Sequence, residues 1–392
     1  MNILLISHIF PNPYANTIGI FVKNQLEILR EYNVIEKVDV FIPVFTKEGR
    51  GLLEHELDKK TIYSLEEESF NLLYIRGTTW LNWPGLNVII ILFRIIRLVR
   101  KLRSEKRYDL IHAHFAYPDG VIAAILSKLF AIPMVMTCHG SDIFRFARRR
   151  WALVLVRMAC RKAKRIFCVS NALATEVKLI TTEKDKVIVT YNGINLSHFY
   201  PISIIDARKR LNLDERDIII LYVGNLIKSK GVMDLLESFL TIKESRKDVR
   251  LVFVGEGPAR GEMQEFIVTH SLDGIICLSG PKEYEEIPVW MSASDLLVLP
   301  SKSEGFGIVL VEALASGKPV VGTDVGGIPE IINSPEVGII VPPGDTDGLA
   351  AAILKAMEKP WDRDKLTQRA QEFSAERLAK ILAEQYNYVG GK

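Results

Sequence analysis

Short apolar runs, many of them rich in isoleucine and valine, recur along the chain and alternate with stretches of helical periodicity. This alternation is typical of α/β proteins built on parallel sheets. Because the runs are apolar on both faces, they belong in sheets that helices cover on both sides. We expect strands at residues 3–7, 38–43, 72–76, 110–113, 134–138, 166–169, 187–190, 218–223, 250–254, 275–278, 296–300, 319–323 and 338–341.

The length of the chain predicts two domains, because 392 residues are too many for one ordinary core. A turn-like stretch, Tyr191-Asn192-Gly193-Ile194, separates the two sets of strands and could act as a hinge. We therefore expect two tandem doubly wound domains, residues 1–190 and 195–372. Open parallel sheets bind ligands at the carboxyl ends of their strands, so a cleft between the domains is the expected ligand site. The last helical pattern, residues 375–392, is not assigned to either domain by its pattern.

The composition narrows the class of protein. Apolar residues make up 48% of the chain and charged residues 25%, as in globular proteins. The four cysteines are scattered, which argues against a zinc site or a disulfide framework and for a reducing compartment. The N-terminal segment lacks the pattern of a signal peptide. The most apolar stretch, residues 86–99, contains two arginines and is too short to cross a bilayer. We expect a cytoplasmic protein.

The net charge of +3 conceals an asymmetry between the two halves of the chain. Residues 1–190 hold 28 Lys and Arg against 18 Asp and Glu, whereas residues 191–392 hold 22 against 29. Within residues 76–165 the imbalance reaches 18 basic against 4 acidic side chains. A concentration of one sign usually indicates a partner of the opposite charge.

Two basic helical patterns, residues 86–107 and 148–165, supply most of this charge. Their cations fall at helical spacing beside apolar residues: Arg94, Arg97, Lys101, Arg150, Arg157, Arg161 and Lys164. Basic amphipathic helices of this type can lie on anionic lipid headgroups, which predicts peripheral attachment to the inner face of a membrane. The alternative is a solvated helix face whose apolar side is simply core. Nucleic acid is not an expected partner, since no recognition module is visible.

The segment 303–317, which reads SEGFGIVLVEALASG, carries the most chemical information. It follows an expected strand, opens with glycines, and continues as a helix that is apolar nearly all round. Glu312 stands inside this apolar helix and needs a hydrogen-bonded partner, because an unpaired buried charge is costly. Glu304 lies in the loop before the helix, whose first N–H groups suit a phosphate. Taken alone, Glu312 could be a structural residue paired with a lysine, and Glu304 could simply be solvated. Both glutamates together with the glycine loop and the helix start favour a ligand site.

Glu304 and Glu312 match the E-x7-E signature of the retaining glycosyltransferases of family 4, which the chain resembles from the first strand to the last helix. The matching segments are EGFGIVLVEALASGKPVVGTDVGGIPEII, Tyr191-Asn192-Gly193-Ile194-Asn195, Val223-Gly224 to Lys230-Gly231, and Gly255-Glu256-Gly257-Pro258. The resemblance implies the GT-B fold, with two Rossmann-like domains facing a cleft. It also implies that the second domain holds a nucleotide diphosphate sugar and that the last helix crosses back to the first domain.

The resemblance assigns roles to residues of the second domain. Glu312 is expected to bind the ribose hydroxyls of the donor, Glu304 the transferred sugar and Lys230 the diphosphate, where a fixed cation offsets the charge on the leaving phosphate. The donor site is completed by Phe306, Gly307 and Ile308 at the helix start. Asn225 stands where the family often has arginine, which removes one expected cation; whether Lys228 substitutes for it stays open.

In the first domain, His139-Gly140-Ser141-Asp142 matches the family's HGxD pattern, so His139 is expected to contact the donor sugar. Gly19 resembles the glycine whose backbone approaches the diphosphate. His114 either lines the acceptor side or is structural.

No metal or other cofactor is expected. Enzymes of the resembled fold generally work without a metal, and we interpret Asp345-Thr346-Asp347 as a helix-capping turn. The stretch GEGPARG, residues 255–261, departs from the dinucleotide fingerprint in its spacing, so we interpret it as a strand-to-helix loop.

The expected activity is transfer of a sugar, with retention, from a UDP-sugar or GDP-sugar to an acceptor hydroxyl. The resemblance to bacterial or archaeal surface-polysaccharide enzymes points to polysaccharide, cell-surface or glycolipid biosynthesis. The alternatives are an epimerase or phosphorylase of the same fold and a non-catalytic protein of the membrane surface.

Overall fold

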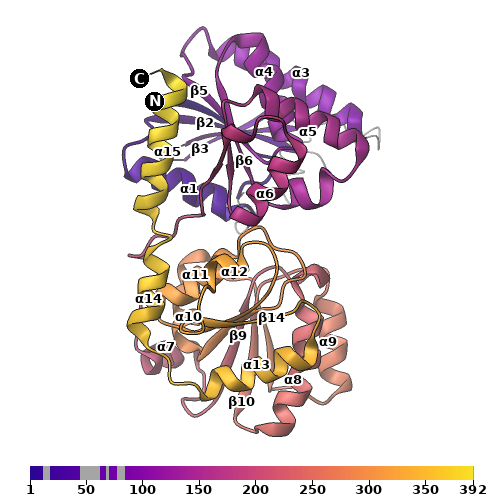
Figure 1. Cartoon of the computed structure of the whole chain (residues 1–392), viewed down its shortest axis with the longest axis vertical. Coiled ribbons are helices and arrows are strands. Elements are labelled where there is room, and N and C mark those ends of the chain that lie inside the picture. Colours follow the sequence, from indigo (N-terminus) through magenta and orange to yellow (C-terminus); the bar gives the residue numbers. More distant parts are fainter. Residues whose placement is uncertain (12–17, 45–61, 68–69, 77–83, 392) are drawn as a thin grey trace. The chain divides into compact units, whose positions relative to one another are not determined.

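The computed structural model describes residues 1–11, 18–44, 62–67, 70–76 and 84–391 (Figure 1). The chain divides into two compact units. Unit 1 comprises Met1–Tyr191 together with Leu378–Lys392, and unit 2 comprises Asn192–Arg377. Each unit is a doubly wound sheet, as the alternating sequence pattern predicts.

Unit 1 contains an eight-stranded sheet in the order β3-β4-β2-β1-β5-β6-β7-β8. All neighbouring strands are parallel except β3 and β4. The strands are β1 (Asn2–Ile6), β2 (Lys37–Val44), β3 (Ile62–Glu67), β4 (Phe70–Arg76), β5 (Leu110–His114), β6 (Met134–Cys138), β7 (Arg165–Cys168) and β8 (Val187–Val189).

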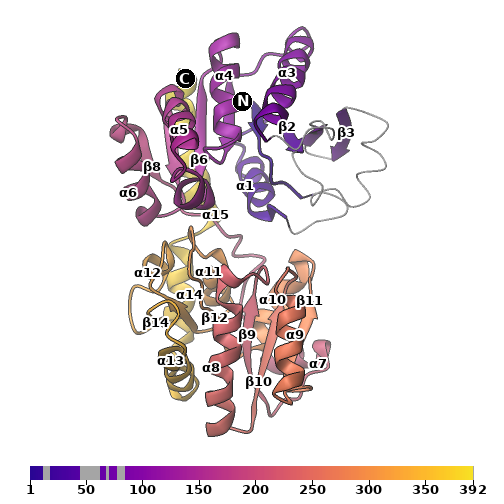
Figure 2. The same ribbon diagram turned by 90° about the vertical axis from the view of Figure 1, so that its right-hand side faces the viewer.

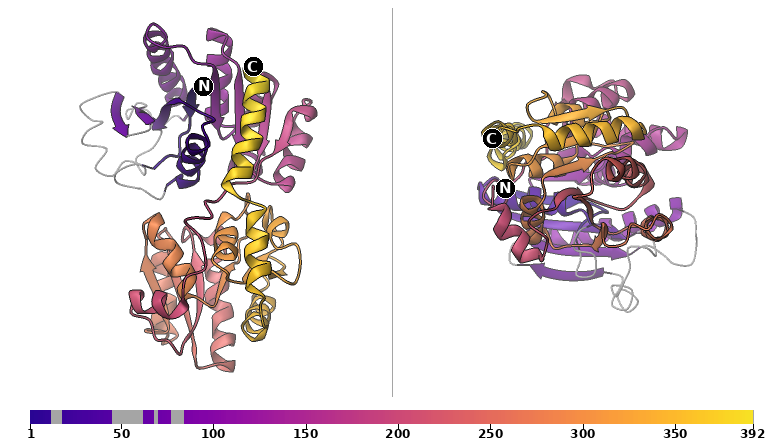
Figure 3. Two further views of the ribbon diagram at one scale, coloured as in Figure 1. Left: turned by 90° about the vertical axis from the view of Figure 1, so that its left-hand side faces the viewer. Right: turned by 90° about the horizontal axis from the view of Figure 1, so that it is seen from below.

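Helices cover both faces of this sheet. They are α1 (Ile20–Glu31), α3 (Pro84–Leu102), α4 (Asp119–Phe130), α5 (Arg150–Lys162), α6 (Asn171–Ile180) and α15 (Ala375–Gly390). One face carries α1 and α15, and the other carries α3, α4 and α5 (Figures 1 and 2). Figure 3 shows α15 running along the sheet of unit 1, where Tyr386 Oη and His112 Nδ1 form a buried hydrogen bond of 2.7 Å.

Unit 2 contains a six-stranded parallel sheet in the order β11-β10-β9-β12-β13-β14. Its strands are β9 (Ile218–Val223), β10 (Val249–Val254), β11 (Ile276–Gly280), β12 (Leu296–Leu299), β13 (Val320–Thr323) and β14 (Gly338–Val341). Its helices are α7 (Ile204–Leu211), α8 (Val232–Ser245), α9 (Arg260–Thr269), α10 (Ile287–Ala293), α11 (Ile308–Ala315), α12 (Ile328–Ile331), α13 (Thr346–Glu358) and α14 (Arg363–Gln371).

Strand β3 was not expected from the sequence. Its residues, IYSLEE, are not a continuous apolar run, and it pairs antiparallel with β4 at the edge of the sheet. A strand at an edge has one unpaired side, so it does not need the apolar character of a central parallel strand. The other strands correspond to expected ones, with ends that coincide or differ by at most two residues.

Each sheet has one point at which the direction of winding reverses. In unit 1, β1 lies between β2 and β5, and in unit 2, β9 lies between β10 and β12. The chain therefore leaves β1 and β9 toward one edge of the sheet and later continues from β5 and β12 toward the other. In open α/β sheets, ligands bind beside the carboxyl ends of the strands at this reversal.

Candidate active site

The reversal point of unit 2 brings together two loops, residues 224–231 after β9 and residues 300–307 after β12. The backbone N–H of Lys302 donates to the carbonyl of Ser229 at 2.9 Å and ties the loops to each other. Gly231 permits this approach, because a Cβ built on it would lie 1.9 Å from the carbonyl oxygen of Pro300. Glycine at position 231 therefore allows the backbones of the two loops to come into contact.

Lys230 and Glu304, which the sequence assigns to the donor site, meet at this point. Lys230 Nζ donates to Glu304 Oε2 at 2.6 Å, and their side chains are 25% and 13% exposed. The Ser301 hydroxyl lies 3.3 Å from the same carboxylate oxygen. The ion pair thus remains partly open to a ligand while its two charges are held in fixed positions.

Glu312 lies on α11 and is 6% exposed. Among the described residues, no hydrogen bond or ion pair involves its carboxylate; the carbonyl of Glu312 accepts from Ser316 Oγ instead. Burial raises the pKa of Glu312 to about 8. The lysine partner considered from the sequence is not present in the described part of the chain, so the carboxyl group is left for a ligand.

The start of α11 is formed as the glycines predict. Gly307 is the residue before the helix, with a φ of 93°, and Ile308 is its first residue. The Phe306 side chain is buried and packs edge-on against Phe373, with ring centroids 5.5 Å apart. The first N–H groups of the helix therefore lie at the carboxyl edge of the sheet, in the loop that carries Glu304.

Asn225 and Lys228 occupy the loop after β9. Asn225 is exposed, and its backbone carbonyl accepts a hydrogen bond from Tyr222 Oη at 2.9 Å. Lys228 is 70% exposed and pairs with Glu262 on α9 at 2.7 Å. Because Lys228 already has a carboxylate partner, we expect that it does not substitute for the arginine that the family often has beside Gly224.

At the reversal point of unit 1, His139 follows β6 and His114 ends β5. His114 Nδ1 and His139 Nε2 are 2.9 Å apart, and their rings are stacked. Burial lowers the pKa of His139 to about 3, so its ring is neutral near pH 7. Because Nε2 is taken by His114, Nδ1 is the atom of His139 through which a ligand would be contacted. His114 is fully buried.

Gly19 precedes α1 and has a φ of 72°. A Cβ built there would lie 2.6 Å from the carbonyl oxygen of Ile9. The close approach of Gly19 to Ile9, in the same connection between β1 and α1, is thus a sufficient reason for glycine at this position, apart from any contact with a diphosphate.

Residues 37–198 match the family described as Glycosyltransferase Family 4, and residues 203–373 match the glycosyl transferases of group 1. The chain is 30% identical over 407 residues to the Bacillus subtilis protein named as the teichuronic acid biosynthesis glycosyltransferase TuaC, covering 99% of both chains. The chain belongs to glycosyltransferase family 4. It is thus an enzyme of the transferase class, as its motifs predict.

Solved structures place this glycosyltransferase in the GT-B fold. Sucrose-phosphate synthase of Thermosynechococcus elongatus superposes with a TM-score of 0.80 at 23% identity, over 99% of this chain and 98% of the other. HepE of Anabaena, solved in complex with UDP and glucose, gives a TM-score of 0.75 at 22% identity, over 98% and 99% of the two chains.

Several polar residues near the glycosyltransferase motifs were not singled out from the sequence. Thr323 Oγ1 donates to the carbonyl of Ser301 at 2.5 Å and fixes the loop that carries Glu304. On unit 1, His8 Nδ1 and Asp119 Oδ2 lie 2.5 Å apart. Burial lowers the pKa of His8, but the neighbouring carboxylate outweighs burial and raises it overall. Thr323 ends β13 and His8 lies two residues after β1, so the signal they share is a polar residue at the carboxyl end of an apolar strand.

The acidic turn at residues 345–347 is a helix cap, as predicted. Asp345 Oδ1 accepts a hydrogen bond of 2.9 Å from the backbone N–H of Gly348 at the start of α13. Within the described residues, no cluster of three or more His, Cys, Asp or Glu side chains is arranged to hold a metal ion.

The basic residues expected at a membrane lie on and beside α3 and α5. All of them are exposed except Arg94, which is half-buried. Exposed apolar side chains stand among them: Ile89, Phe93, Trp151, Val154 and Met158. Of the helices that the structure describes, none is long and apolar enough to span a bilayer.

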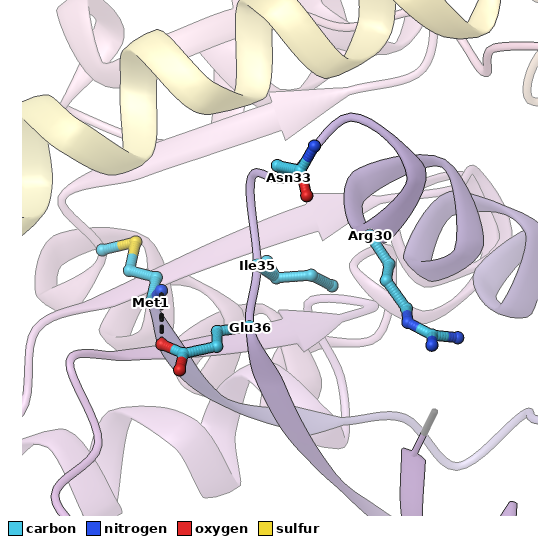
Figure 4. A pocket seen from close by; sticks show the side chains of 5 residues that line it. All are labelled: Met1, Arg30, Asn33, Ile35 and Glu36. Atoms are coloured by element: carbon cyan, nitrogen blue, oxygen red, sulfur yellow. Dashed lines mark ion pairs between the residues drawn. The ribbon is translucent and has the colours of Figure 1, made fainter. Parts of the chain in front are cut away.

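A hollow of about 460 Å³ lies elsewhere on unit 1, lined by Met1, Arg30, Asn33, Ile35 and Glu36 (Figure 4). It lies beside the amino ends of β1 and β2. Ligands of this fold class bind at the opposite, carboxyl ends of the strands, so we do not assign this hollow to the active site.

Proposed function

We propose that the enzyme transfers a sugar, with retention of anomeric configuration, from a UDP-sugar or GDP-sugar to an acceptor hydroxyl. The observation that carries this proposal is the grouping of Lys230, Glu304 and the start of α11 at the reversal point of unit 2, with the unpartnered Glu312 on the same helix. In the proposal Glu312 binds the ribose hydroxyls, Glu304 the transferred sugar and Lys230 the diphosphate. His139 contacts the donor sugar through Nδ1.

The similar proteins support a nucleotide-sugar donor and a role in polysaccharide biosynthesis. HepE is solved with UDP and glucose and also with UDP-glucose. TuaC is named for the biosynthesis of teichuronic acid. We accordingly propose a role in polysaccharide, cell-surface or glycolipid biosynthesis. That the enzyme works without a metal is a proposal that rests on the sequence resemblance alone.

The proposed step exchanges one bond to the anomeric carbon for another on the same face of the sugar. The bond from the anomeric carbon to the diphosphate oxygen breaks as the bond to the acceptor oxygen forms. The acceptor proton passes to the departing phosphate oxygen. Lys230 stabilises the charge on the leaving group, and its position is fixed in advance by Glu304, which avoids reorganisation during the reaction. No protein nucleophile is required.

Nucleotide binding tests the donor site. UDP or GDP is expected to raise the melting temperature of the protein more than the corresponding nucleoside, because only the diphosphate engages Lys230 and the start of α11. Lys230→Ala should reduce that difference, because only the start of α11 then remains to bind the diphosphate. Lys228→Ala, which alters an exposed pair between the same loop and Glu262 on α9, should retain the full difference. Equal shifts in Lys230→Ala and the parent protein would contradict the assigned role.

Turnover separates the proposed reaction from the alternatives of the same fold. A transferase consumes the donor only together with an acceptor, apart from slow hydrolysis, whereas an epimerase converts the donor alone. Conversion of a UDP-sugar or GDP-sugar into its epimer without an acceptor would therefore refute the proposal.

We further propose that unit 1 attaches to anionic membranes through α3 and α5. Exposed Phe93, Trp151 and Val154 can enter the headgroup region while the arginines beside them bind lipid phosphates. Flotation with anionic vesicles at low salt should carry the protein to the top of the gradient, and added salt should release it. A protein that stays at the bottom at low salt would disprove the attachment.

A further inference from the structure

An aromatic and basic cluster lies at the carboxyl edge of the unit 1 sheet, beyond His139. A π-helical turn, Asp142–Phe146, follows β6 and leads to α5. The guanidinium carbons of Arg145 and Arg149 lie 5.8 and 5.7 Å from the centroid of the same ring, Phe146. Both arginines are exposed.

Two further rings border the arginines. Tyr117, in the loop after β5, lies 5.8 Å from the ring of Phe146 and 5.3 Å from the ring of Trp151. Trp151 is 51% exposed. The cluster thus combines two exposed cations with partly exposed aromatic surface. It is built from two segments, the one that carries the arginines and the loop after β5 that carries Tyr117.

No carboxylate neutralises these arginines among the described residues. Asp142, which begins the same turn, is fully engaged by backbone N–H groups: Oδ2 accepts from Ala116 and Oδ1 from His139 and Gly140, at 2.8, 3.2 and 2.9 Å. Asp119, at the start of α4, is held by His8 at 2.5 Å. Both acids are buried, whereas Arg145 and Arg149 are exposed.

Two cations that share one ring repel each other, and the nearest carboxylates do not offset that repulsion. A ligand anion would do so. A phosphate fits better than a carboxylate. A carboxylate presents one planar edge to a single guanidinium group, whereas the three terminal oxygens of a phosphate can accept hydrogen bonds from two guanidinium groups. The flanking rings suit the sugar or apolar chain to which such a phosphate is attached.

We propose that Arg145 and Arg149 bind a phosphate or diphosphate group of the acceptor, with Tyr117 and Trp151 against the attached moiety. This site is distinct from the donor diphosphate site at Lys230, because it belongs to unit 1 and has its own cations. The proposal rests on the transferase function above, and it gives the acceptor a chemical class: a phosphorylated sugar or a phosphate-linked lipid.

Inorganic pyrophosphate serves as the probe, measured by calorimetric titration. All variants carry Lys230→Ala, which weakens the donor site, so that any remaining contribution of the start of α11 is the same in each of them. The background protein should bind pyrophosphate, and adding Arg145→Gln with Arg149→Gln should raise Kd at least about tenfold, as expected for lost charge-assisted hydrogen bonds. The matched control, Lys178→Gln with Lys184→Gln, removes the same charge from exposed positions of unit 1 outside α3 and α5 and should change Kd less than about twofold.

The proposal would be overturned if the background protein did not bind pyrophosphate. It would also be overturned if both double variants weakened pyrophosphate binding equally, because an equal loss reflects net charge alone. Vesicles containing phosphatidic acid distinguish the sources of the phosphate. Lower vesicle binding in Arg145→Gln/Arg149→Gln than in the control supports a lipid-linked acceptor, and unchanged vesicle binding with weaker pyrophosphate binding supports a soluble one.

A separate measurement shows whether the proposed donor site itself is wrong. The thermal shift of UDP or GDP, measured with Lys230 intact, reports the donor site of unit 2 and should be the same in the parent protein and in Arg145→Gln/Arg149→Gln. If neither nucleotide shifts the parent protein, the donor assignment fails while the pyrophosphate titration still decides the arginine site.

Discussion

Glu312 makes the stability of unit 2 depend on pH. Below pH 4.5 its carboxyl group is protonated in the folded and unfolded chain alike, but between pH 4.5 and about 8 only the unfolded chain ionises, because burial raises the pKa of the folded form. The free energy of unfolding should therefore fall by about 1.4 kcal/mol per pH unit across this window. Glu312→Gln should lack that term, so denaturant unfolding should show the variant gaining on the parent protein as pH rises. Parallel profiles for the two proteins would be inconsistent with a buried, unpartnered carboxyl group.

Lys230 and Glu304 are expected to act in turnover rather than in folding. Replacing either residue by alanine should lower kcat about 10²- to 10³-fold, the usual effect of removing one preorganised electrostatic contact to the transition state. Lys228→Ala is the matched control and should keep kcat within about twofold, because its partner is the exposed Glu262. Circular dichroism should confirm that all variants fold. A loss of activity equal in Lys228→Ala and Lys230→Ala would show that loop charge in general, and not Lys230, matters.

At the residue scale, the sequence identifies Lys230, Glu304 and Glu312 as candidate donor-site residues but does not reveal their contacts. The spacing of Glu304 and Glu312 is visible in the sequence, whereas the 2.6 Å contact between Lys230 and Glu304 joins residues 74 positions apart. The use of His139 Nε2 by His114 was likewise hidden, because it depends on the register of β5 against β6. These details arise from long-range packing, which no local pattern records.

At the element scale, the cost of replacing a glycine by alanine should depend on how closely another loop approaches it. Gly231 and Gly344 both have positive φ, 69° and 80°. A Cβ on Gly344 meets nothing within 4 Å, so Gly344→Ala should cost only the backbone strain, about 1–2 kcal/mol. Gly231→Ala should cost about 3 kcal/mol or more and weaken nucleotide binding, because its Cβ would displace the loop after β12. Chemical denaturation and nucleotide titration of the two variants check this; equal costs would contradict the tight crossing.

Elements with continuous apolar runs were predictable from the sequence, and the edge strand was not. The central strands β5 and β6 coincide with the expected ones within one residue, because strands buried on both faces need uninterrupted apolar residues. Strand β3 contains polar residues and forms by pairing with β4 at the edge of the sheet. It therefore lacks the continuous apolar run by which the other strands are recognised in the sequence.

At the scale of the whole molecule, α15 joins residues far apart in the chain. The Tyr386 hydroxyl bonds His112 Nδ1 inside unit 1, and His112 Nε2 bonds Thr137. Tyr386→Phe would leave a buried ring nitrogen without a partner and should destabilise unit 1 by about 1–3 kcal/mol. Tyr388→Phe is the matched control on the same helix, since Tyr388 is 67% exposed, and should be within about 0.5 kcal/mol of the parent protein. Amide hydrogen exchange of β5 reports the difference, and equal protection in both variants would contradict a structural role for the bond.

The central claim is that this enzyme transfers a sugar from a nucleotide diphosphate with retention. Proton NMR of the glycoside formed from a UDP-sugar or GDP-sugar tests it most directly, because the coupling of the anomeric proton reports the configuration of the new bond. We predict that the product keeps the configuration of the donor and that it forms about 10²- to 10³-fold more slowly with Glu304→Ala. A product of inverted configuration would contradict the claim.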